Sequence, residues 1–273
     1  MKKIWDTLNC IKMPDKIFYP LLVACALLAM LTVSYLFYCG EPILERDSIS
    51  YVQLLEYYKS NGRLPMVWYI SSLPFILFHL AGMIPGVSIE NGMFLVNNIA
   101  FGFSIVLTGM TAKKLLKNSE AALFCALIYS LFPKIIVVNA SLMRESCGIC
   151  FALATMFFFI SALDSGKIRY FFFTAYCGLC AVFCRIELLE LQMIIGIVML
   201  VMLFCKEWKI QYFFRSILIY ICGIICALTV IACLLGGTLE EYRNIPDIIL
   251  FRCKASSGLL EDEADVPDYY FYQ

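Results

Sequence analysis

Residues 18–39 read FYPLLVACALLAMLTVSYLFYC and contain no charged side chain. An α-helix of about 20 apolar residues crosses the roughly 30 Å hydrocarbon core of a bilayer, so this run can span it. It is too long for the apolar core of a signal peptide, and no cleavage motif of small residues closes it. We predict an uncleaved first span, and the four lysines between Met1 and Lys16 indicate a cytoplasmic N-terminus.

The composition of the whole chain indicates an all-α integral membrane protein. Of its 273 residues, 62% are hydrophobic and 15% are charged, against about 45–50% and about 25% in a typical soluble domain. One core of this size cannot bury so much apolar surface, so lipid must surround much of it. The net charge is zero, which gives no basic field for binding nucleic acid.

Eight apolar segments approach the length of a span, and basic connections between them decide which ones cross. The segments are 18–39, 65–85, 92–112, 120–138, 146–163, 170–186, 188–205 and 214–236. The basic connections are Lys113-Lys114-Leu115-Leu116-Lys117, the turn with Lys167 and Arg169, and the stretch from Lys206 to Arg215. If all eight segments cross, these three connections face outward, against the preference of Lys and Arg for the cytoplasm.

If segment 65–85 stays on one side, all three basic connections become cytoplasmic. We therefore predict seven spans, with segment 65–85 lying at the membrane surface or re-entering it. Its three prolines and its aromatic side chains are typical of such a segment.

This topology predicts a membrane module over 1–236 and a tail over 237–273. The first extracytoplasmic loop is 40–91, the second surrounds Ser141 to Ser146, and the third is a tight turn from Arg185 to Glu190. The tail carries eight acidic and three basic side chains and is expected on the outer side.

The 14 cysteines lie mostly inside apolar runs at helical spacing, which is typical of small packing residues. The single histidine, His79, has no ligand cluster at zinc spacing beside it, so a zinc site is disfavoured.

The first loop contains a candidate carboxylate. From Ser48 to Asn61 the apolar residues recur on one face, which predicts an amphipathic helix at the membrane surface. Asp47 directly precedes this helix and Glu45 lies two residues earlier. Asp47 is interpreted either as the N-cap of the helix or as a functional carboxylate that faces a cavity.

The other two outer turns add arginines and further carboxylates. Arg144 and Glu145 lie in the second loop, and Arg185 follows the span that begins near residue 170. Charged groups at a membrane boundary are costly unless they pair or face water. They are interpreted either as a local ion pair and interfacial anchors or as a phosphate-binding site on the outer side.

The order of short motifs in this chain resembles that of the multispan glycosyltransferases of the GT-C type, particularly the polyprenyl- or dolichyl-phosphate-mannose protein mannosyltransferases and the aminoarabinose transferases. An acidic motif follows the first span, a proline-led aromatic segment comes next, a span ends in a basic turn, a later span contains a proline, and a second acidic loop precedes a glycine-containing span that ends in arginine. The corresponding residues are 45–51 (ERDSISY), 65–69 (PMVWY), 111–116 (TAKKLL), Pro133, 141–145 (SLMRE) and Gly178 to Arg185.

The resemblance implies transfer of a sugar from a polyprenyl-phosphate donor to a protein, lipid or glycan acceptor on the extracytoplasmic face of the cell membrane. Asp47 matches the expected catalytic base, and Arg144 and Arg185 match groups that bind the donor phosphate. Glu145 and Glu45 match acidic positions that orient the acceptor or a metal. Some members bind a divalent metal ion and others need none.

Two alternatives stay open. One is a lipid-linked saccharide transporter or polymerase-like membrane protein, which would also bind lipid phosphates. The other is a catalytically incomplete GT-C module that works with a membrane-protein partner, as the end of the chain shortly after the last expected span suggests.

The topology can be tested with single-cysteine labelling or reporter fusions at Lys114, Arg169 and Lys209. We expect all three sites to report the cytoplasm, because crossing by segment 65–85 would place them outside. An external signal at any two of the three would contradict the predicted arrangement.

Overall fold

The computed structural model describes residues 13–40 and 46–236, together with the isolated residue 247. Within those ranges the ordered elements are helices, and no strand is present. Of the predicted tail over 237–273, only residue 247 lies among the described residues.

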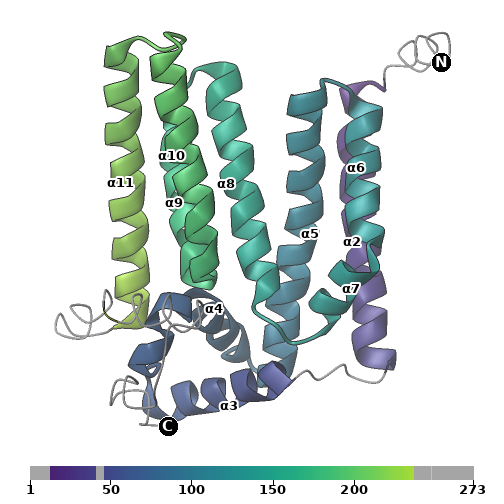
Figure 1. The fold of residues 1–273 in the computed structure, drawn as a ribbon. Coiled ribbons are helices and arrows are strands. Elements are labelled where there is room, and N and C mark those ends of the chain that lie inside the picture. The colour runs from purple at the N-terminus through teal and green to yellow at the C-terminus, as the bar shows by residue number, and fades with distance from the viewer. Residues whose placement is uncertain (1–12, 41–45, 237–246, 248–273) are drawn as a thin grey trace, which may run out of the picture.

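Five helices are long and apolar enough to cross a membrane. They are α2 (Asp15–Cys39), α5 (Ile89–Leu116), α8 (Glu145–Ser165), the 3-10 turn η2 (Ile186–Leu188) continued by α10 (Leu189–Phe204), and α11 (Ile210–Leu235). They run alongside one another and, with the other helices between them, form a bundle with two ends (Figure 1). This confirms the prediction of an all-α chain with several helices that are long and apolar enough to span a membrane.

A sixth candidate span is broken. Helices α6 (Ser119–Leu131) and α7 (Pro133–Ala140) are apolar enough together, but they are bent by 55° at Phe132. The cause is Pro133, which disfavours the helical conformation in the residue before it, and Phe132 adopts a φ of −68° and a ψ of 116°. The predicted span over 120–138 is therefore a pair of helices with a bend between them.

The predicted count of seven spans is not confirmed. The remaining long apolar run forms α9 (Arg169–Cys184), which has only 16 residues and a length of about 24 Å. Nine of these residues are buried, and α9 packs against α8, α10 and α11. Neighbouring helices therefore cover more than half of the residues of α9.

The first loop forms three short elements at one end of the bundle. They are α3 (Arg46–Asn61), the 3-10 helix η1 (Met66–Ser71) and α4 (Ser72–Gly82). Helix α3 lies across the ends of the long helices (Figure 1). Since no long helix forms over 65–85, the start of α2 and the three basic connections all lie at the opposite end.

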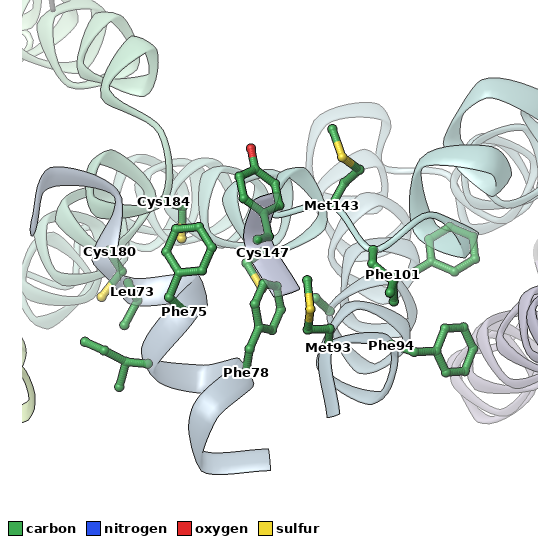
Figure 2. Packing of buried hydrophobic residues seen from close by; sticks show 14 of the residues in the cluster. Leu73, Phe75, Phe78, Met93, Phe94, Phe101, Met143, Cys147, Cys180 and Cys184 are labelled. Carbon is green, nitrogen blue, oxygen red and sulfur yellow. The ribbon is translucent and has the colours of Figure 1, made fainter. Parts of the chain in front are cut away.

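Helix α4 belongs to the segment predicted to lie at the membrane surface or to re-enter it, and most of α4 is covered by other parts of the protein. Seven of its 11 residues are buried, among them Phe75 and Phe78. Figure 2 shows these two rings together with Met93 of α5, Cys147 of α8 and Cys184 of α9. Because α4 is apolar on nearly all sides, it fills the space between the helix ends instead of leaving one face open.

Close contact between α9 and α11 depends on Gly223. A Cβ atom added there would lie 2.4 Å from the carbonyl oxygen of Phe172 and 3.0 Å from the Cβ of Ala175. Small residues of this kind allow helix backbones to approach closely in lipid.

We expect Gly223→Ala to lower the thermal stability of the purified protein in detergent, at a cost of about 1–3 kcal/mol from overpacking against α9. Gly196→Ala on α10 is the matched control, because nothing lies within 4 Å of an added Cβ there. Equal melting temperatures for the two variants would show that α9 and α11 do not pack as described.

Candidate functional site

The end of the bundle that carries α3 also carries the connection between α7 and α8. The hydroxyl of Ser48 donates to the sulfur of Met143 at 3.7 Å, and both side chains are buried. The Asn97 side-chain amide donates to the Met143 carbonyl oxygen at 2.6 Å. These contacts hold the backbone beside Asp47 close to the backbone beside Arg144.

Arg144 is the central cation of this site. Its guanidinium carbon lies 5.7 Å from the ring centroid of Tyr51 on α3 and 5.8 Å from that of Trp68 on η1. Its Nε and Nη1 atoms are buried and have no hydrogen-bond partner among the described residues. Aromatic faces stabilise a cation through their quadrupoles, but they accept hydrogen bonds poorly. Two donors therefore remain for a ligand.

A second arginine lies beside the first residue of α8. Arg185 Nη1 donates to Glu145 Oε1 at 3.3 Å, and Arg185 Nε donates to Glu187 Oε2 at 3.3 Å. The other oxygen of Glu145, Oε2, is buried without a partner among the described residues. Arg185 is thus held between two carboxylates at the end where α9 meets η2.

Four charged side chains of the site affect the pKa of Tyr51. Burial raises the pKa of the Tyr51 phenol, Arg144 opposes this rise, Glu145 and Asp47 add to it, and Arg185 opposes it. All four charged side chains therefore act on one hydroxyl group. The ion pair of Arg185 with Glu145 and the position of Arg144 beside the Tyr51 ring bring three of the sequence-predicted residues to this end of the bundle.

Asp47 is the most peripheral of these groups. It is the second residue of α3 and lies within its first turn, so the interpretation of Asp47 as the N-cap is not supported. Its side chain is exposed and forms no ion pair with another described residue. A carboxylate in the first turn is favoured by the helix dipole. Glu45, the other predicted first-loop carboxylate, lies outside the described residues.

The sequence analysis missed three residues that build the site, namely Tyr51, Trp68 and Asn97. Tyr51 and Trp68 were quoted only as members of the motifs 45–51 and 65–69, and no role in the site was assigned to them. Asn97 is fully buried in α5. An amide inside an otherwise apolar span was a usable signal, because such a group needs a partner in lipid.

Within the described residues, no group of three or more His, Cys, Asp or Glu side chains is arranged to hold a metal ion. No family model, curated protein or solved structure matches this chain.

A double-mutant cycle can test whether Glu145 and Arg185 form a coupled pair. We expect Glu145→Gln and Arg185→Gln to show a coupling of about 1 kcal/mol in stability measurements, because the Glu145 side chain is only 19% exposed. The matched cycle with Glu187→Gln should give a coupling near zero, since Glu187 is 56% exposed and solvent screens the pair. Equal couplings in the two cycles would contradict this geometry.

Proposed function

We propose that this chain is a membrane glycosyltransferase that takes a sugar from a polyprenyl phosphate and transfers it to a hydroxyl acceptor at the outer end of the bundle. The observation that carries the proposal is that the Nε and Nη1 atoms of Arg144 are buried and unused as donors. A guanidinium binds phosphate oxygens through parallel N–H donors, and burial strengthens such hydrogen bonds. The position of Arg144 at the end of apolar helices suits a phosphate that is attached to a lipid tail.

The proposed topology has seven spans. Helices α6 and α7 would cross as one bent span, and α9 would cross as a short span shielded by α8, α10 and α11. The three lysine-containing connections would face the cytoplasm, which places Arg144 outside.

The proposed chemistry divides the work among the charged groups. The acceptor hydroxyl oxygen attacks the anomeric carbon, and Asp47 takes the proton of that hydroxyl. The Asp47 side chain is exposed, so an acceptor can reach it. The bond from the anomeric carbon to the phosphate oxygen breaks, and its electron pair leaves with the lipid phosphate. Arg144 and Arg185 would stabilise that negative charge. Glu145 would keep Arg185 oriented.

Binding and turnover separate these roles. Purified protein in nanodiscs would be titrated with farnesyl phosphate as a soluble probe of polyprenyl-phosphate binding. Arg144→Gln should weaken binding by roughly ten-fold or more, since a hydrogen bond to a charged group contributes about 1.5–3 kcal/mol. Arg169→Gln is the matched control, because Arg169 begins α9 at the other end of the bundle. Unchanged affinity in Arg144→Gln would contradict the proposed phosphate site.

Asp47→Asn addresses catalysis in the same preparation. It should leave probe binding unchanged and lower sugar transfer from a polyprenyl-phosphate sugar by about 10²–10⁴-fold, the usual contribution of a positioned base. Full transfer activity in this variant would remove Asp47 from the mechanism. Probe binding without any transfer by the parent protein would instead favour the transporter-like or incomplete module.

A further inference from the structure

A polar cleft with a volume of about 300 Å³ opens at the basic end of the bundle, opposite Arg144. It lies where α2 begins and where α5 and α8 end (Figure 1). Its charged lining consists of Asp15, Lys113, Lys114, Lys117 and Asp164. Small-molecule sites have volumes of about 300–1,000 Å³, so this cleft is large enough for a compact polar group.

Four of the five charged side chains in the cleft form two ion pairs. Lys113 forms an ion pair with Asp15 of α2, and Lys114 Nζ lies 3.6 Å from Asp164 Oδ2 of α8. Lys117 is exposed and forms no ion pair with another described residue. Three lysines against two aspartates leave one net positive charge in the lining. A purely anionic or purely cationic ligand would therefore meet like charges as well as opposite ones.

The central lysine is fixed in place. The ammonium nitrogen of Lys113 lies 4.4 Å from the Phe18 ring centroid and 4.6 Å from the Tyr19 ring centroid. These cation–π contacts and the ion pair with Asp15 hold the Lys113 side chain in place within the protein.

Lys114 is also engaged, because it lies 3.6 Å from Asp164 Oδ2 and 5.8 Å from the Phe157 ring centroid. Lys117 is therefore the cation most available to bind a phosphate oxygen, and Lys114 lies three residues before it.

The aspartates retain acceptor capacity. Their side chains are 68% and 52% exposed for Asp15 and Asp164, and each contacts its lysine through one carboxylate oxygen. The second oxygen of each can accept a hydrogen bond from a primary ammonium group. A quaternary ammonium has no N–H donor and cannot make this bond.

The surroundings favour a lipid over a soluble ligand. Leu115 and Leu116 beside the cleft are 61% and 53% exposed, and Tyr19 is 46% exposed. Such apolar side chains at the end of membrane helices can contact acyl chains while the cleft takes the polar headgroup.

We propose that this cleft binds the headgroup of a phospholipid that carries both a phosphate and a primary ammonium group, as in an ethanolamine phospholipid. Lys114 and Lys117 bind the phosphate, and Asp164 and Asp15 accept hydrogen bonds from the ammonium. The site is independent of the proposed glycosyltransferase activity, because it lies at the other end of the bundle.

The test uses the full chain in nanodiscs that contain ethanolamine, choline or glycerol phospholipids with identical acyl chains, and native mass spectrometry counts retained lipids after release. We expect retention of the ethanolamine lipid to exceed that of the other two by roughly ten-fold, as expected for one added charged hydrogen bond. Lys117→Gln should weaken retention of all three lipids, because the phosphate that Lys117 binds is common to them. Lys209→Gln, in another connection at the same end, is the matched control and should not change retention.

Asp164→Asn separates the ammonium contact from the phosphate contact. It should remove the preference for ethanolamine over choline lipid while the melting temperature stays near that of the parent, because the carboxylate is half exposed. Equal retention of all three lipids by the parent would overturn the proposal. Stronger retention of the glycerol lipid would also overturn it, as would displacement of the ethanolamine lipid by free phosphoethanolamine at equal concentration.

Discussion

The cost of placing charge in hydrocarbon governs the arrangement of this bundle. Along α2, from Ile17 to Cys39, and in the middle of α5, α8 and α11, the described chain contains no charged side chain. Charged groups are thereby collected at two ends, where water and lipid headgroups can solvate them. Each end then becomes a place where charges from segments far apart in the sequence meet. Glu145 and Arg185 meet at one end, and Lys114 and Asp164 meet at the other.

This constraint explains which features could be predicted from the sequence. The free-energy cost of placing a segment in lipid depends on that segment's own residues. The apolar runs and the charge of their connections were therefore enough to predict the helices and the end at which each connection lies. The bend at Phe132 could also have been anticipated from Pro133, because that rule is local. The burial of α4 could not, since it depends on the space left between α5, α9 and α11. An apolar pattern alone does not distinguish a helix covered by protein from one covered by lipid.

The candidate site shows the same division. Arg144, Glu145 and Arg185 were predicted because charged residues beside apolar runs are conspicuous. Their partners were not, because Tyr51 and Trp68 approach Arg144 only after the first loop has folded across the helix ends. The candidate site contains arginines and the opposite end mainly lysines, and these two cations bind ligands differently. A guanidinium offers a fixed planar set of donors, whereas an ammonium is a compact and strongly hydrated charge.

The environment of Arg144 also bears on why the residue is present. A buried cation with unsatisfied donors lowers stability, and an apolar side chain of similar volume in its place is often neutral or stabilising. The two aromatic rings reduce that cost without removing it, because they leave Nε and Nη1 without acceptors. Tyr51 and Trp68 therefore help to keep the Nε and Nη1 atoms of Arg144 away from water before a ligand binds. An incoming phosphate would lose its own water but would meet donors that have none to lose, which favours tight and oriented binding at this position.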